Sequence, residues 1–342
     1  MIGAYPAFGA LGLLAAIAVI ELLAAREGLS ALAATALIAV SVATLFALLM
    51  AVKIVTGGER NRYLDHQMGL LVTVPLAAWA LGQPVLRSLD IVLMGLGTML
   101  AFTRVGCLME GCCHGKPGRW GVRYGDAHVA HGFRRELAYV RLLPVQLAES
   151  VLVLALVAAG VALVLSDAEP GSAAALYVVG YGLLRFSLEL LRGDRAHPYP
   201  RGYSAAQWIV LALMAATVAL EASGVLPFAL WHAVALVALV ALVGLWRPPA
   251  ARESHHVREL GAIVARLEEA GDAGIRVHRT SLGVGVSAGL VERDGTLLRH
   301  YSLSHADPAL ARVVGRLAGA ADGGEVVPGG HGVLHVLVPI RD

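Results

Sequence analysis

Eight long runs of apolar residues, almost free of charge, follow one another along the first 246 residues. A helix of about 20 such residues crosses the hydrocarbon core of a bilayer with every backbone group paired internally. We therefore predict that each run forms a membrane-spanning helix. The runs cover residues 4–23, 31–52, 69–86, 91–108, 145–165, 173–191, 204–220 and 225–246.

The pattern changes after Trp246, where Arg247-Pro248-Pro249 ends the last run. Charges at helical spacing predict a helix over residues 253–269, and a second helix is predicted over residues 308–319. Strands are predicted over residues 275–281, 283–293, 297–302 and 332–339, with a turn at Asp294-Gly295. The fold class is thus an all-α polytopic membrane protein with seven or eight transmembrane helices and a small C-terminal α+β soluble domain. Its predicted parts are a transmembrane domain (1–222), an additional helix and linker (223–249) and the soluble domain (250–342).

Composition agrees with this organisation, since 57% of the 342 residues are apolar and only 15% are charged. A soluble domain has about a quarter of its residues charged, so most of this chain needs the bilayer as its solvent. The net charge of +2 says little about the partners of the protein. The chain has no basic stripe with interleaved aromatic residues, so nucleic acid is not expected as a partner.

Three cysteines fall within seven residues, at Cys107, Cys112 and Cys113, and His114 follows them. Zinc would use such donors, but adjacent cysteines have poor ligand spacing, so we predict no metal site and leave a disulfide or reduced thiols open. The histidines of the C-terminal domain are dispersed and lack paired ligand spacing, which favours surface or strand-face positions. They are His255, His256, His278, His300, His305, His331 and His335.

Charged residues within or beside the predicted spans are functional candidates, because each costs about 2.5–3.5 kcal/mol at the centre of a membrane helix. Four places stand out, and in one of them two charges are four residues apart and share a helix face. The four are Arg104, the pair Arg185 and Glu189 followed by Arg192, the pair Gln146 and Glu149, and His66.

Each of these groups also has a structural interpretation. Arg185 and Glu189 can form an ion pair that only holds helices together, Arg104 can extend to the membrane surface, and a lone histidine such as His66 is often only a hydrogen-bonding group. Taken together, the groups suit phosphate-ester chemistry. Arginines and a lysine clamp a phosphate, carboxylates hold the arginines, and a histidine moves a proton.

Five segments resemble, in order, those of the bacterial prolipoprotein diacylglyceryl transferase family. In the signature segment that runs from Arg104 to Pro117, Arg104, Gly106 and Gly115 match and Lys116 keeps the charge. The other four segments begin at His66, Pro144, Tyr181 and Ser204. They are His66-Gln67-Met68-Gly69-Leu70-Leu71, Pro144-Val145-Gln146-Leu147-Ala148-Glu149, the Arg-Phe-x-x-Glu helix from Tyr181 to Arg192, and Ser204-Ala205-Ala206-Gln207.

The chain also departs from the family pattern at several positions. Cys107 and Glu110 replace the two signature asparagines, and Cys112 replaces the glutamate. Leu143 stands in place of the histidine before Pro144, and Ala148 in place of the tyrosine before Glu149. Asp90 stands where an aspartate usually opens the next span.

The resemblance implies transfer of a diacylglyceryl group from phosphatidylglycerol, or a related anionic phospholipid, to the lipobox cysteine of a prolipoprotein signal peptide, with no metal or redox cofactor. The catalytic residues that it implies are His66, Arg104, Arg185 and Glu189. The residues that it implies for lipid or substrate binding are Gly69, Gly106, Cys107, Glu110, Gly115, Lys116, Gln146, Glu149, Arg192 and Gln207.

The same resemblance implies a multi-pass protein of the bacterial plasma (inner) membrane with its catalytic loops on the outer face. Two connections are long and polar, at residues 57–65 and 110–143, and the second is rich in arginine. By the positive-inside rule its basic residues favour the cytoplasm. We follow the family, since arginines that bind anionic lipid do not report topology. The alternatives are a diverged transferase with another acceptor, or a non-catalytic lipid-binding or sensory membrane protein.

Overall fold

The computed structural model describes residues 3–57, 62–133, 137, 139, 141–193, 202–246, 262–263, 266–267, 269, 277–280, 283–305, 325–330 and 333–339. Its internal contacts divide the chain into two compact units. The first unit comprises Met1–Met109, Val145–Leu190 and His197–Arg247, and the second comprises Glu110–Pro144, Leu191–Ala196 and Pro248–Asp342. The predicted boundaries between the three parts of the chain, after residues 222 and 249, stay a prediction.

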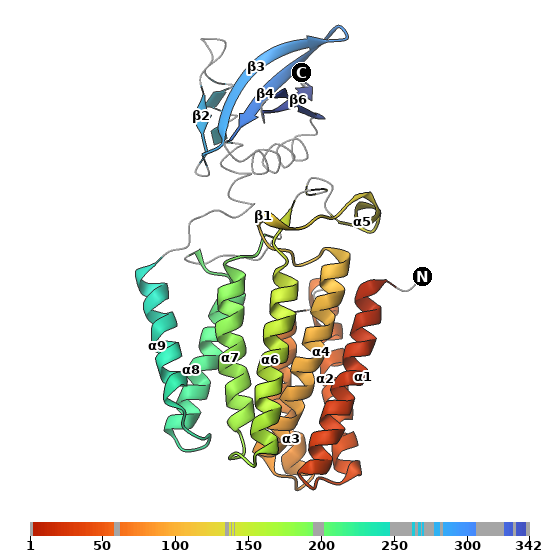
Figure 1. Ribbon diagram of the computed structural model, residues 1–342, viewed down its shortest axis with the longest axis vertical. Coiled ribbons are helices and arrows are strands. Elements are labelled where there is room, and N and C mark those ends of the chain that lie inside the picture. Colours follow the sequence, from red (N-terminus) through yellow and green to blue (C-terminus); the bar gives the residue numbers. More distant parts are fainter. Residues whose placement is uncertain are drawn as a thin grey trace. The chain divides into compact units, whose positions relative to one another are not determined.

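Among the described residues of the first unit, eight long helices run side by side (Figure 1), and only the last residue of α4 belongs to the second unit. Five of them are long and apolar enough to cross a membrane: α1, α2, α4, α6 and α8. The multi-pass architecture is thereby confirmed. The helices are α1 (Ala4–Arg26), α2 (Ala31–Thr56), α3 (Tyr63–Ala80), α4 (Val85–Glu110), α6 (Val145–Leu165), α7 (Ser172–Glu189), α8 (Ala205–Ala222) and α9 (Leu230–Leu245).

The third predicted span was wrong in its limits. Helix α3 begins at Tyr63 and ends at Ala80, whereas the apolar run covered residues 69–86. The first turns of α3 are helical but contain polar residues, so they do not belong to the apolar run. Gly82 adopts a left-handed conformation (φ 63°) and Pro84 follows it, which ends α3 and starts the turn into α4.

Helix α4 lies at the centre of the first unit. In its most apolar stretch 72% of the residues are buried, against 11–33% for the other four candidate spans. Gly97 lets its neighbours approach, because a Cβ atom there would lie 2.6 Å from side-chain atoms of both Tyr177 on α7 and Val157 on α6. The backbone of α4 is therefore packed directly against side chains of these two helices.

Helix α9 is attached at both ends, to α8 and to the residues just before it. Near the start of α9, His232 shares a buried hydrogen bond with Glu221, which is close to the end of α8. At the other end, the Tyr203 hydroxyl donates a hydrogen bond of 2.5 Å to the carbonyl oxygen of Trp246. Two polar anchors thus fix a helix whose other surfaces are mostly exposed.

The loop between α4 and α6 is folded, and its structure was not predicted. It contains the strand β1 (Pro117–Val122) and the short helix α5 (Asp126–Ala130). Four apolar side chains form a small core beneath them, and an antiparallel backbone bridge joins Val122 to Leu142. The core residues are Tyr124, Phe133, Leu137 and Leu142.

The C-terminal region contains a five-stranded antiparallel sheet in the order β2-β3-β4-β6-β5. The predicted turn is present, since Asp294 (φ 53°) and Gly295 (φ 75°) are both left-handed, as a two-residue hairpin between twisted strands requires. The sequence did not predict β5. The strands are β2 (His278–Arg279), β3 (Gly285–Arg293), β4 (Thr296–Ser304), β5 (Glu325–Pro328) and β6 (Leu334–Pro339).

Alternate residues of these strands form the core of the sheet, on one of its faces. Ile263 and Leu267, from the segment predicted as the first C-terminal helix, belong to the same core. Most of that segment and the helix predicted at 308–319 lie outside the described residues. The core residues on the strands are Val286, Tyr301, Leu303, Leu334 and Val336, and Val284, just before β3, joins them. The predicted α+β soluble domain is thus confirmed in its sheet.

Candidate active site

Polar side chains gather at one end of the helix bundle, where α3, α6 and α8 begin and α4 and α7 end. Two cross-links show that these helix ends meet. Arg104 of α4 pairs with Glu149 of α6 at 2.8 Å, and the Gln207 amide of α8 donates to the carbonyl oxygen of Phe186 on α7 at 3.1 Å. Four of these side chains, on four different helices, are buried: Arg104, Glu149, Gln207 and, on α7, Arg185.

Arg104 is held inside the bundle by a carboxylate. Its Nε lies 2.8 Å from Oε2 of Glu149, and the Tyr181 hydroxyl donates to the other oxygen, Oε1, at 3.0 Å. Arg104 is only 8% exposed, so its guanidinium does not extend to the surface as snorkelling would require. In so buried a place a charge interacts more strongly than in water, which favours binding of an anion there.

Arg185 and Glu189 pair along one face of α7, as their four-residue spacing predicted. The distance from Nη2 of Arg185 to Oε2 of Glu189 is 2.7 Å, and both residues are buried. The second terminal nitrogen of Arg185, Nη1, is also buried and has no hydrogen-bond partner in the described part of the chain. This nitrogen therefore still has a hydrogen bond to donate, and an anionic ligand could accept it.

Three tyrosines belong to the same cluster, although none was among the predicted site residues. The hydroxyl groups of Tyr63 on α3 and Tyr177 on α7 lie 2.6 Å apart, and the ring of Tyr63 meets that of Tyr181 edge-on at 4.9 Å. A signal was present in the sequence. Tyr177 and Tyr181 continue the four-residue spacing of Arg185 and Glu189, so one face of α7 is polar along its length.

Gln67 was also missed. It follows His66 on α3, is fully buried, and neither its amide nitrogen nor its amide oxygen has a hydrogen-bond partner among the described residues. Tyr63 lies one turn earlier on the same helix face. An unpaired buried amide is costly in a membrane protein, where no water is at hand to replace the lost hydrogen bond. Gln67 is thus a candidate for contact with a ligand.

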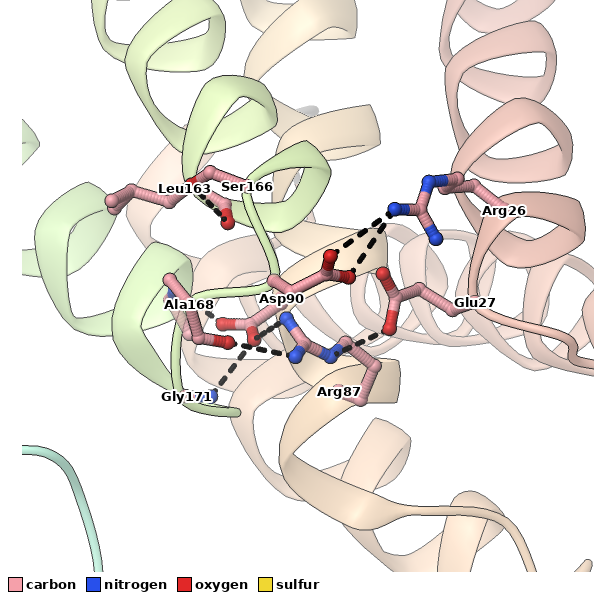
Figure 2. A network of polar contacts seen from close by, with 10 residues as sticks. Arg26, Glu27, Arg87, Asp90, Leu163, Ser166, Ala168 and Gly171 are labelled. Atoms are coloured by element: carbon pink, nitrogen blue, oxygen red, sulfur yellow. Dashed lines mark hydrogen bonds and ion pairs between the residues drawn. The ribbon is translucent and has the colours of Figure 1, made fainter.

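At the opposite ends of α4 and α7, Asp90 ties the two helices together (Figure 2). Its two carboxylate oxygens accept hydrogen bonds from the backbone N–H groups of Gly171 (2.8 Å) and Ala174 (2.7 Å). These bonds cap the start of α7. Arg87 lies beside it, 3.0 Å from Glu27 and 2.8 Å from the carbonyl oxygen of Ala168. Since α4 begins at Val85, Asp90 lies inside this helix and does not open it.

This cap sets the relative height of the two arginines. Arg104 follows Asp90 by 104 − 90 = 14 residues, and Arg185 follows Gly171 by 185 − 171 = 14 residues. Fourteen residues of α-helix rise by about 21 Å. Because α4 and α7 run in the same direction from the Asp90 cap, the two guanidinium groups are carried to the same level of the bundle.

Two of the predicted binding residues are packing glycines. A Cβ atom at Gly69 would lie 2.6 Å from Leu48 of α2, and one at Gly106 would lie 3.0 Å from the Cα atom of Tyr5 on α1. Both positions let neighbouring helices approach closely. Their contact with lipid stays a prediction.

The other predicted residues are placed as follows. In the first unit, His66, Cys107 and Gln146 are buried, and Gln207 also forms the capping box of α8 with Ser204. In the second unit, Glu110 is exposed, Gly115 forms a backbone bridge with Arg192, and the Lys116 N–H donates to Leu191. Cys112 is exposed and Cys113 half-buried, and no disulfide joins the three cysteines, all of which lie in the described part.

The cluster suits a phosphate group. Arginine side chains present N–H donors in a fork that matches phosphate oxygens, and the carboxylates and phenol hydroxyls hold these donors in place. Each of the two arginines has a carboxylate partner, so the two ion pairs together carry no net charge before an anion binds. Together with Gln67, they make a polar site inside an otherwise apolar helix bundle.

Comparison with known proteins gives the family of the chain. The family described as prolipoprotein diacylglyceryl transferase matches residues 1–222, which is more than half of the chain. The chain is also similar to the phosphatidylglycerol–prolipoprotein diacylglyceryl transferase of Clostridium tetani (strain Massachusetts / E88), with 32% identity over 120 residues, or 34% of this chain and 44% of that protein. The match thus spans less than half the length of that relative. On the family match, the chain belongs to the prolipoprotein diacylglyceryl transferase family.

Proposed function

We propose that this protein transfers the diacylglyceryl group of phosphatidylglycerol to the lipobox cysteine thiol of a prolipoprotein. The observation that carries the proposal is the state of Arg185. Its guanidinium is buried and paired with Glu189 on one side, and its Nη1 nitrogen has no partner among the described residues. A phosphate oxygen of the lipid headgroup would complete its hydrogen bonds.

The reaction forms one bond and breaks another. The sulfur of the acceptor cysteine attacks the glycerol carbon of the diacylglyceryl group, and the bond from that carbon to the phosphate oxygen breaks. Glycerol phosphate leaves with the electron pair of this bond. The thiol proton passes to a base, and we assign this role to His66, because imidazole titrates near neutral pH.

The arginines would act on the leaving group. Phosphate gains negative charge as the carbon–oxygen bond breaks, and the buried Arg104 and Arg185 would stabilise that charge. Glu149 and Glu189 would position the arginines and keep the resting site neutral. Such donors lower the barrier because they are already oriented before the reaction begins.

We also propose that this end of the bundle faces the outer side of the bacterial plasma membrane. The basic residues of the loop after α4 would then meet anionic lipid headgroups and the signal peptide. Substituted signature positions such as Cys107, Glu110 and Cys112 support a second candidate, a diverged transferase of the same lipid group with another acceptor.

The proposal is tested by complementation in bacteria depleted of their own diacylglyceryl transferase. We expect rescue by the intact chain and loss of rescue by Arg185→Ala, because removal of a donor that stabilises a transition state costs about 10²–10³-fold in rate. Arg26→Ala is the matched control, since Arg26 is 46% exposed in its side chain and pairs with Asp167 outside the cluster. Immunoblots of the membrane fraction check that all three proteins are present.

A direct assay separates the remaining possibilities. Purified protein is given labelled phosphatidylglycerol and a lipobox peptide, and both labelled peptide and released glycerol phosphate are measured. Release of glycerol phosphate without labelled peptide would indicate another acceptor. Neither product from intact, correctly inserted protein would reject the transferase proposal and leave a lipid-binding or sensory role.

A further inference from the structure

The C-terminal sheet carries two histidines and a serine on the face opposite its core. Strand residues alternate between the two faces, so the buried Tyr301 and Leu303 of β4 point one way and His300 and Ser302 point the other. On β6, His335 stands directly opposite Ser302 in the strand register. All three polar side chains are half-buried.

The polar atoms of these side chains lie within hydrogen-bond distance of one another. The Nε2 of His300 lies 2.8 Å from the Nδ1 of His335, and the Ser302 hydroxyl lies 3.1 Å from that Nδ1 and 3.4 Å from that Nε2. The two histidines are 35 positions apart along the chain, so their spacing did not predict this contact.

Gly329, just after β5, leaves room for the ring of His335. A Cβ atom at this glycine would clash with Nε2 of His335, so a larger residue would displace the imidazole. The other nitrogen of this ring, Nδ1, contacts His300.

We propose that His300 and His335 bind a divalent transition-metal ion that favours right-angled ligands, of the class of nickel and copper. Two imidazole nitrogens that bind one ion at about 2.0–2.1 Å and at a right angle are about 2.9 Å apart, close to the observed separation. Imidazole nitrogens favour these ions, whereas magnesium and calcium favour oxygen ligands. The Ser302 hydroxyl is a weaker third donor, and water completes the shell.

The two ring nitrogens share one hydrogen bond, so the ion would take the place of the proton between them. With the ion bound, both remaining ring nitrogens carry the protons. The ion would link β4 to β6 and thereby stabilise the sheet, since it binds only the folded arrangement.

Nickel binding to the full-length protein in detergent micelles tests the proposal. We compare wild type with His300→Gln and His335→Gln, using Ni²⁺ alone as the probe and isothermal titration as the measurement. His278→Gln on β2 is the control. We expect at least a tenfold weaker Ni²⁺ site in each of the first two variants and unchanged binding in the control. A Ni²⁺-dependent rise of the unfolding temperature should appear in wild type and in the control, but not in the first two variants.

Two further measurements keep the test decisive if a glutamine variant fails to fold. Gly329→Ala keeps both imidazoles but displaces one, so it should weaken Ni²⁺ binding as well. In the wild type, bound Ni²⁺ should protect His300 and His335, but not His278, from carbethoxylation, as mapped by mass spectrometry. Equal Ni²⁺ binding in wild type and both glutamine variants, or protection of all three histidines alike, would overturn the proposal. The site is independent of the transferase activity.

Discussion

Two buried guanidinium groups, Arg104 and Arg185, each have a carboxylate within 2.8 Å. A buried ion pair adds little net stability, because desolvation of the two charges offsets their attraction, but removal of one partner leaves a charge with no compensation. The pairs are therefore better explained by the anion that the arginines would bind than by stabilisation of the fold.

Replacement of Glu149 by glutamine should destabilise the protein by about 3–5 kcal/mol, because Arg104 keeps its charge and loses its counter-charge. The double variant Arg104→Gln/Glu149→Gln should be more stable than Glu149→Gln alone, yet inactive. Thermal unfolding in micelles and the labelled-lipid assay measure the two effects. If the double variant is as unstable as the single one, Glu149 stabilises the protein mainly through Tyr181, from whose hydroxyl it accepts a hydrogen bond.

Gln67 gives a prediction of the opposite kind. Its amide is buried and has no partner in the described part of the chain, so Gln67→Leu should leave stability unchanged or raise it by about 1–3 kcal/mol. If the amide binds the lipid, the same variant should raise the KM for phosphatidylglycerol. Lower stability with unchanged kinetics would instead assign the amide a structural role.

At the scale of elements, the relation between α4 and α7 matters most. Each of these helices carries one arginine of the cluster, and Asp90 fixes their register by capping α7 from α4. A shift of α7 by one turn would move Arg185 by about 5.4 Å. The cap therefore positions the site from the far ends of both helices.

Asp90→Ala should lower the free energy of unfolding by about 2–4 kcal/mol, because two backbone donors lose their cap and Arg87 loses a carboxylate. Transferase activity should fall as well, although Asp90 is outside the cluster. Asp167→Ala is the control: its pair with Arg26 is exposed and should contribute about 1 kcal/mol or less. Full activity in a destabilised Asp90→Ala protein would contradict the register argument.

At the scale of the whole molecule, the family match ends at residue 222, within the first unit, and the C-terminal sheet has its own core. Helix α9 follows the matched region but is anchored on the preceding helix by His232 and on Tyr203 by the Trp246 carbonyl. The bundle is thus complete only at Trp246.

A chain that ends at Trp246 should keep its transferase activity, because every member of the polar cluster and both anchors of α9 are retained. A chain that ends at Ala222 should be destabilised by about 3–5 kcal/mol, since Glu221 loses His232 as its buried partner. Complementation and the amount of membrane-inserted protein measure the difference. Loss of activity in the chain that ends at Trp246 would assign the soluble domain a part in the reaction.

The amino-acid sequence by itself determined the features that depend on neighbours along the chain. Apolar runs predicted the helices, a four-residue spacing predicted the pair of Arg185 and Glu189, and Asp294-Gly295 predicted the hairpin of β3 and β4. These features are local, because a helix turn and a hairpin turn bring together residues that are two to four positions apart.

Only the tertiary structure decided which distant residues meet. Arg104 pairs with Glu149, Asp90 caps α7, and His300 contacts His335 because helix packing and strand register place them together. No spacing in the sequence encodes those distances. The burial of Gln67 has the same origin, since a polar residue at the start of a helix is exposed or enclosed according to the neighbours that pack on it.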